Sequence, residues 1–208
     1  MRRFRIVLGI IAGIMVLAMI VIGVIGLLRG PAPETVTPEP SSSHAEPTSA
    51  DPAPLPQTRA PEAFARAVAE RLFSWDTGGD AGPADYMQPL VDAAHDSEPV
   101  ALASDLRGYF PDQGNWGELR HMQVRQWLTI DRAVIPDAWA IAQAQARPGQ
   151  LPEGSTAYTI DGTRQRTGIR GTEPVRIDQP VAFTVFVVCP PAASCTLLRL
   201  SALDQPLR

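Results

Sequence analysis

Residues 180–203 read PVAFTVFVVCPPAASCTLLRLSAL. Two apolar runs, 180–189 and 195–203, are separated by PPAAS, a segment of turn-forming residues. Runs of this length that are rich in Val, Phe and Leu and bounded by Pro and Ser are typical of buried strands. The stretch therefore predicts an antiparallel hairpin, and with it a C-terminal half built as a β-sheet.

Further strands are expected upstream of this hairpin. Residues 124–135 (VRQWLTIDRAVI) read as a strand, Pro136-Asp137 as a turn, and 138–147 (AWAIAQAQAR) as an alternating partner strand. Asp161-Gly162 stands between TAYTI and TRQRTGI, and an Asp-Gly pair between two such runs favours a two-residue hairpin turn. These segments predict an antiparallel sheet.

The segment ahead of the strands has helical periodicity. In PEAFARAVAERLFSW (61–75) apolar residues recur at spacings of four, four and three, which predicts a core-facing helix stripe made of Phe64, Val68, Leu72 and Trp75. A second helix is expected from Pro83 or Ala84 to about Ala94, and a short one around 102–109, followed by a loop over 111–117. Helices followed by strands indicate an α+β fold with helices packed on one face of the sheet.

The triplet Asp76-Thr77-Gly78 follows the first predicted helix. Asp-Thr-Gly carries the catalytic carboxylate of aspartic proteases, where it follows an apolar strand. Here the preceding residues have a helical period, and Gly78-Gly79 suits the end of a helix. We therefore expect the triplet to close the helix and to have no catalytic role.

The N-terminal region predicts a membrane anchor. Residues 6–28 contain no charge and no proline, and as a helix they cover about 34 Å at roughly 1.5 Å per residue, enough to cross a bilayer core. Arg2, Arg3 and Arg5 precede the run, so the positive-inside rule predicts a cytoplasmic tip (1–5), a transmembrane helix (6–28) and an exported remainder. The alternative is a cleaved signal peptide, but the run exceeds the usual apolar length and ends in Leu27-Leu28-Arg29, without a small-x-small site.

The predicted localisation is thus the cell membrane, with a single pass and with membrane lipid as a partner. Residues 29–60 are rich in Pro, Ser, Thr and Glu and poor in apolar side chains, which predicts a disordered linker. The sequence from 61 to 208 is then one extracytoplasmic α+β domain. In an exported hairpin, Cys189 and Cys195 face each other across the turn, and we expect a disulfide between them.

No motif in the sequence indicates a cofactor, a metal or a catalytic site. His44, His95 and His121 lack partners at metal-ligand spacing, and GxSxG and HExxH are absent. From residue 61 onward, 13 arginines stand against 18 acidic residues, so direct nucleic-acid binding is not expected. The one basic concentration comprises Arg164, Arg166, Arg170 and Arg176. Arg164 and Arg166 share a strand face and can meet an anionic partner, but the favoured interpretation is a solvated hairpin.

In this layout, with its short tip, single span, Pro-rich tether and first helix AFARAVAERLFSWD, the chain resembles the membrane scaffold proteins of conjugative transfer and type IV secretion machines. Phe73-Ser74-Trp75 matches the aromatic-Ser/Thr-Trp ending of the first helix in the Gram-positive, actinobacterial type. The resemblance implies a cone-shaped fold like that of nuclear transport factor two and cystatin, with helices cupped by a curved antiparallel sheet. It covers residues 60–204 in architecture and the first helix in motif.

Three functions compete at this point. The first is a non-catalytic scaffold of a conjugative DNA-transfer channel that binds copies of itself and other membrane-complex proteins. The second is an enzyme or ligand-binding domain that uses the cavity of the cone, for which the candidate residues are Asp131, Tyr158 and His121. The third is an anchored accessory subunit of another envelope complex, such as a lipid-import system. We expect the first.

Overall fold

A computed structural model describes residues 52–208, and these form an α+β domain, as predicted. The predicted cytoplasmic tip, the predicted span and most of the predicted linker lie outside the described residues. No helix within 52–208 has the length and apolar character needed to cross a membrane. In chain order the elements are α2 (Pro61–Phe73), β1 (Trp75–Asp76), α3 (Pro83–Asp92), α4 (Pro99–Leu106), α5 (Gln113–His121), β2 (Arg125–Val134), α6 (Asp137–Gln145), β3 (Ser155–Arg170), β4 (Glu173–Val188) and β5 (Thr196–Leu200).

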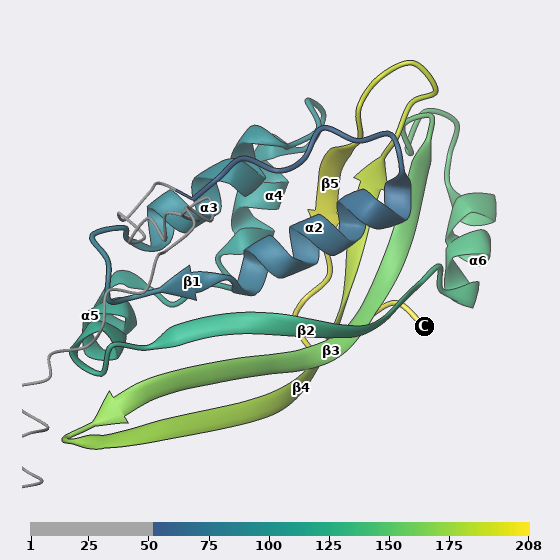
Figure 1. The fold of residues 1–208 in the computed structure, drawn as a ribbon. Helices are drawn as coiled ribbons and strands as arrows, with labels where there is room; N and C mark the ends of the chain where they lie inside the picture. The colour runs from purple at the N-terminus through teal and green to yellow at the C-terminus, as the bar shows by residue number, and fades with distance from the viewer. Residues whose placement is uncertain (1–51) are drawn as a thin grey trace, which may run out of the picture. The chain divides into compact units, whose positions relative to one another are not determined.

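The strands form one antiparallel sheet in the order β1-β2-β3-β4-β5, which curls around α2 (Figure 1). β3 and β4 each have 16 residues and pair along their whole length. Gly171 and Thr172 connect them, and Gly171 adopts a φ of 66°, a conformation that glycine takes without steric cost. β5 pairs only with Val185–Val188, so the distal half of the β3–β4 hairpin extends beyond it (Figure 1).

The core lies between α2 and the sheet face that α2 covers, called the inner face below. Side chains alternate along a strand, so Ile160 on β3 and its partner Phe183 on β4 share this face, and both are fully buried. The stripe residues Phe64, Val68 and Leu72 are buried on α2, and each stabilises the fold by roughly 2 kcal/mol through burial. Trp75, the last stripe residue, is also buried but belongs to β1.

The opposite face of the sheet is called the outer face. At the end of the sheet away from the β3–β4 turn, α6 and the C-terminal segment cover this face. The ring of Trp139 on α6 lies 5.9 Å from that of Phe186 on β4. The Ala138 N–H donates to the carbonyl of Arg208, and the Thr159 hydroxyl donates to the carbonyl of Leu207. The expectation that all helices pack on one face is therefore wrong for α6, which lies at the end of the sheet near the C-terminus in Figure 1.

The prediction of a strand over 138–147 is wrong, because this segment forms α6. Its alternation arises from Ala at every second position, and the intervening residues after Trp139 are Ile and Gln. Ala and Gln are good helix formers, and Asp137 complements the positive helix N-terminus. The two-residue period was thus a property of Ala spacing and did not reflect a buried strand face.

The predicted hairpin turn at Asp161-Gly162 is also wrong, because both residues lie in the middle of β3. Asp161 accepts hydrogen bonds from Arg132 and Arg208 on the outer face. A Cβ on Gly162 would lie 2.5 Å from the carbonyl oxygen of Thr129, next to the bulge that interrupts β2. Gly162 therefore allows two backbones to approach closely, a role that a glycine inside a strand often has.

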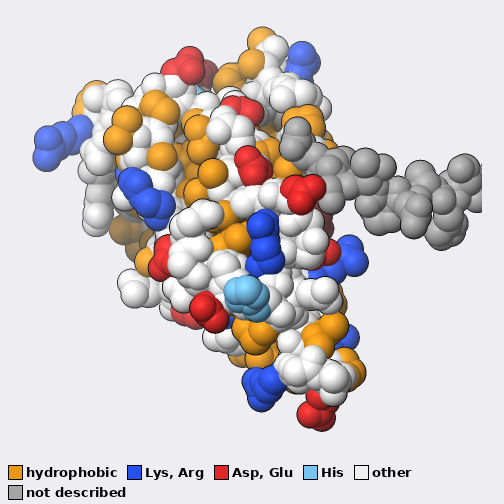
Figure 2. All heavy atoms as spheres, turned by 90° about the vertical axis from the view of Figure 1, so that its left-hand side faces the viewer, with side chains coloured by type: hydrophobic (Ala, Val, Ile, Leu, Met, Phe, Trp, Pro, Cys, Tyr) orange, Lys and Arg blue, Asp and Glu red, His pale blue; other side chains and the backbone are white. Residues whose placement is uncertain are grey.

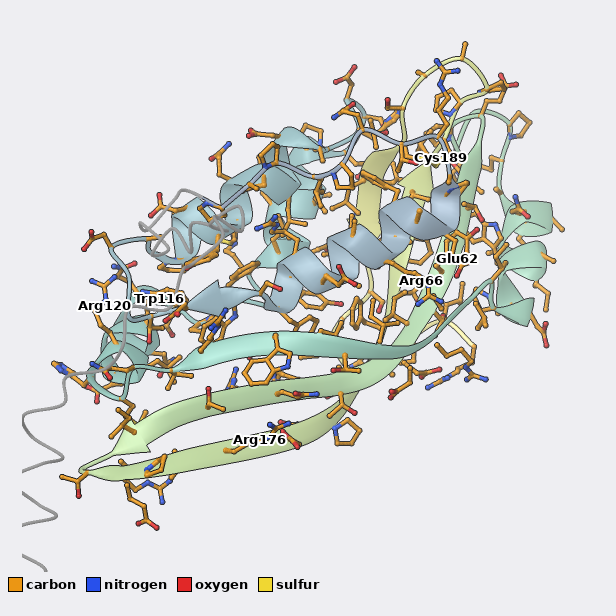
Figure 3. All side chains as sticks on the ribbon, in the orientation of Figure 1. Glu62, Arg66, Trp116, Arg120, Arg176 and Cys189 are labelled. Carbon is orange, nitrogen blue, oxygen red and sulfur yellow. A yellow bond between two sulfur atoms is a disulfide. The ribbon has the colours of Figure 1, made fainter. Side chains whose placement is uncertain are left out.

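The loop predicted over 111–117 is wrong as well, because most of it belongs to α5. Asp112 caps this helix by accepting the N–H of Asn115. The ring of Trp116 lies 5.3 Å from that of Trp75, and Arg120 donates to the backbone carbonyls of Gly79, Asp80 and Ala81 (Figure 3). The second and third helices appear as α3 and α4, and α4 begins earlier than predicted.

The predicted disulfide between Cys189 and Cys195 is present and closes the loop between β4 and β5. The described end of the predicted linker lies against this loop, since the Cys195 N–H donates to the carbonyl of Thr58. Leu55 in the same segment is buried in the core. The packed part of the chain thus begins before Pro61, and the disulfide holds both strand ends beside it.

Candidate functional site: an arginine pair on the inner face

Beyond the end of α2, the inner face changes from apolar to cationic. A row across four strands consists of Trp75 on β1, Gln126 on β2, Arg166 on β3 and Ile177 on β4, which are neighbours in the strand register. Arg166 donates from Nε to the Oε1 atom of Gln126 at 2.6 Å, and its guanidinium lies 5.4 Å from the ring centroid of Trp75. These contacts hold the Arg166 side chain against the sheet.

The next row toward α2 adds a second cation on the same face. Arg164 lies two residues from Arg166 on β3, pairs in register with Leu128 and Gln179, and donates a hydrogen bond to the Gln179 side chain. Residues two apart on a strand share a face and lie roughly 6.6 Å apart. Both side chains therefore leave the same face of β3 and are partly buried; that of Arg166 is directed toward Gln126 on β2, and that of Arg164 toward Gln179 on β4.

The pair is held at an electrostatic cost. Burial, followed by the neighbouring charge of Arg164, lowers the pKa of Arg166 to about 10. Burial also lowers the pKa of Arg164, an effect that Asp204 partly opposes. Both groups stay charged at neutral pH, so two like charges occupy one partly dehydrated surface.

Within residues 52–208, no carboxylate forms an ion pair with either arginine. Their side-chain partners are the neutral amides of Gln126 and Gln179. Arg199 on β5, by contrast, pairs with Asp105 at 2.7 Å. A guanidinium pair without a carboxylate presents free N–H donors suited to a carboxylate or phosphate group, and Ile177, which is 55% exposed, adds apolar surface beside it.

The predicted basic cluster is thus divided by the fold. Arg164 and Arg166 lie together on the inner face, whereas Arg176 on β4 lies on the outer face over the ring of Trp127, at 5.7 Å, and pairs with Asp178 at 3.0 Å (Figure 3). Arg170 lies at the hairpin turn and is exposed. Alternation along β3 predicted that Arg164 and Arg166 share a face, but the lack of a carboxylate partner was not visible in the sequence.

A shallow depression of about 230 Å³ adjoins this row at the β1 edge of the sheet. Its lining includes Trp75 and Gln126, which contact Arg166, together with Asp76, Tyr86 and Arg125. The Tyr86 hydroxyl donates to the carbonyl of Asp76 and accepts the N–H of the same residue. Gln126 was not among the predicted site residues, although a glutamine on the buried side of a strand indicates a polar contact within the sheet.

The Asp-Thr-Gly triplet has a structural explanation. Thr77 is fully buried, and its hydroxyl lies within hydrogen-bond distance of the carbonyls of Val124 and Leu119, at 2.9 and 3.1 Å. The Asp76 carboxylate accepts the N–H of Gly78, which closes a local turn after β1. The triplet therefore fixes the junction between α5 and β2. The expectation that it closes the first helix is wrong, because α2 ends at Phe73 and Asp76 belongs to β1.

The residues proposed for a catalytic cavity do not gather at one place. Asp131 lies in the β2 bulge, at the level of Asp161 and Gly162, whereas Tyr158 on β3 pairs with Val185, and His121 ends α5 ahead of β2. Burial, followed by the charge of Glu62, raises the pKa of Tyr158, so its phenol stays neutral at physiological pH. Among residues 52–208, no group of three potential ligands is placed to hold a metal ion.

Charge is dispersed over the face that Figure 2 shows, where basic, acidic and apolar side chains are interspersed. This distribution differs from the continuous basic stripe typical of nucleic-acid-binding domains. No protein-family model, curated protein or solved structure matches the chain.

Proposed function

We propose that this chain is a membrane-anchored, non-catalytic scaffold whose folded domain binds an anionic group of a partner protein. The observation that carries the proposal is the pair Arg164 and Arg166, which is partly buried and without a carboxylate partner in the described part of the chain. Binding an anion would relieve the repulsion between the two charges. An acidic segment of another envelope protein supplies such a group.

Within this class, we favour a component of a conjugative DNA-transfer channel. Supporting features are the uncharged run over 6–28, the Pro-rich segment that follows it, and the Phe73-Ser74-Trp75 ending of the first helix. The curled antiparallel sheet around α2 agrees with the cone-shaped fold that the resemblance implies. The runner-up is an accessory subunit of another envelope complex, which would use the same arginine pair.

Transfer from donor cells that carry the gene on a mobile element tests the proposal. We expect deletion of the gene to abolish transfer, and R164Q/R166Q to fail to restore it although the protein reaches the membrane at the normal level. R170Q is the matched control, because Arg170 is on the same strand but exposed at the turn. Normal transfer after deletion would exclude the conjugative role, and full restoration by R164Q/R166Q would exclude the arginine pair.

A reporter fused after Leu203 tests the topology on which the proposal rests. Arg2, Arg3 and Arg5 ahead of the apolar run predict, by the positive-inside rule, that the domain lies outside the cytoplasm. The fusion should be active only with a reporter that functions outside the cytoplasm. Activity of a cytoplasmic reporter at the same position would reverse the orientation.

A further inference from the structure

The distal half of β4 has one free edge. β5 pairs with Val185–Val188, and the segment after β5 continues the pairing through backbone bonds to Thr184 and Ala182. Within residues 52–208, no strand pairs with this edge of β4 from Glu173 to Pro180 (Figure 1). Such an edge offers backbone donors and acceptors to another strand.

Along a strand, the backbone N–H and carbonyl groups of successive residues point alternately to the two neighbouring strands, which determines the groups available at this edge. Ala182 and Thr184 direct their N–H and carbonyl groups to the edge, so Arg176 and Asp178 direct theirs to it too. Pro174 and Pro180, two residues before Arg176 and two residues after Asp178, also face this edge, and proline has no N–H to offer. The edge therefore offers a short pairing segment with a proline on either side.

We propose that two copies of this chain pair antiparallel along this edge, about a two-fold axis at Ile177. Of the symmetric registers centred on 176, 177 and 178, the first places Arg176 opposite Arg176 and the last places Asp178 opposite Asp178. The register centred on Ile177 places Arg176 of each copy opposite Asp178 of the other. Opposite charges across a strand pair stabilise it and like charges destabilise it, so the edge is self-complementary in this register alone.

The prolines support the same register. With Ile177 on the axis, Pro174 of one copy lies opposite Pro180 of the other, so the positions that lack an N–H face each other. Arg176 and Asp178 then form hydrogen-bonded pairs, and the two Ile177 side chains form a closely spaced pair between them. Ile177 is 55% exposed in the single chain, and pairing would cover it.

Pairing would also join the two arginine sites. A two-fold axis perpendicular to the sheet leaves the inner faces of both copies on the same side, so Arg164 and Arg166 of both copies lie on one continuous sheet. The inference rests on the proposed function in that it requires the membrane anchor. The contact is short, and anchoring both copies in one membrane supplies the effective concentration that so small an interface needs.

Disulfide cross-linking of the full chain in phospholipid vesicles tests this pairing. The two native cysteines are bonded to each other, so I177C adds the one free thiol in the chain. In the proposed register the two substituted positions lie opposite each other at about 4.5 Å between Cα atoms, within reach of a disulfide. I169C is the matched control, because Ile169 is an exposed isoleucine of the same hairpin but lies on β3, away from the edge.

We expect mild oxidation to give a dimer with I177C and only collisional background with I169C. In the I177C background, D178R should abolish the dimer, because it places two arginines opposite each other, and R176D/D178R should restore it. Equal cross-linking of I177C and I169C, or no recovery in the charge-swapped variant, would overturn the pairing. The pairing would also be overturned if I177C in cells formed a cross-link only to a different protein and none to a second copy of this chain. The vesicles contain no other component, so this result is independent of the transfer assay.

Discussion

Replacing Arg164 by glutamine should stabilise the fold. Most substitutions destabilise a protein, so the sign of this effect is diagnostic. Arg164 lies beside Arg166 on β3, and Gln179, its hydrogen-bond partner, is exposed and can bind water in its place. The R164Q variant thus loses a like-charge repulsion, offset in part by the lost attraction to Asp204, without leaving a buried group unsatisfied.

The size of the effect follows from Coulomb's law. At the roughly 7 Å spacing of positions two apart on β3, two unit charges repel by about 0.6 kcal/mol in water and about 2.4 kcal/mol at an effective dielectric constant of about 20. These values are upper limits, because hydrogen bonds direct the two guanidinium groups to different neighbouring strands. The pair is partly exposed, so we expect R164Q to gain about 1 kcal/mol, equivalent to a rise in Tm of about 3 °C. In 1 M salt, where the Debye length is about 3 Å, most of the gain should disappear.

Urea unfolding followed by tryptophan fluorescence measures this change. All four tryptophans, at positions 75, 116, 127 and 139, lie in the described domain, so the signal reports on the domain in the full chain. R170Q is the control and should leave stability unchanged. The reasoning would be refuted if R164Q destabilised the domain equally in low and high salt, because Arg164 would then support the fold.

Three further predictions concern the rest of the domain. Burial alone would raise the pKa of Asp161, but hydrogen bonds from Arg132 and Arg208 lower it below its usual value; its contribution to stability is then present above about pH 3.8 and lost as the pH falls through the lowered pKa. D161N should cost about 1 kcal/mol at pH 7 and progressively less as the pH falls below about 3.8, in urea titrations at each pH; a cost that does not change with pH would contradict this. Removing the disulfide with C189S/C195S should lower the free energy of unfolding by about 2.4 kcal/mol through loop entropy, and an unchanged urea midpoint would show that the loop is held by packing alone. T77V should cost about 0.5–1.5 kcal/mol in the same assay, because it removes the hydroxyl from the carbonyls of Val124 and Leu119, which keep their backbone N–H donors, whereas a cost below about 0.5 kcal/mol would indicate that the hydroxyl contributes little to the fold.

Local periodicity predicted those parts of the fold that depend on one buried stripe or run. Phe64, Val68 and Leu72 predicted α2, and the two apolar runs around Cys189 and Cys195 predicted β4, β5 and the disulfide between them. These elements bury large apolar side chains, and burial dominates the choice of local structure there.

The predictions were wrong where they depended on residue spacing or a turn dipeptide and not on large apolar side chains that the fold buries. The Ala alternation in α6 resembled a strand period, and Asp161-Gly162 resembled a turn although Gly162 serves a close approach between strands. The candidate site was predictable only in part. Alternation placed Arg164 and Arg166 on one face, but their burial and their neutral partners depend on β2 and β4, whose register the sequence did not specify.

The central claim is that Arg164 and Arg166 form a binding site for an anionic group. The most direct test is to titrate the full chain with inorganic pyrophosphate and follow the urea midpoint, since a ligand that binds the folded state raises its stability with concentration. The claim predicts a saturable rise in the wild type and in R170Q and none in R164Q/R166Q. An equal rise in all three proteins would contradict it.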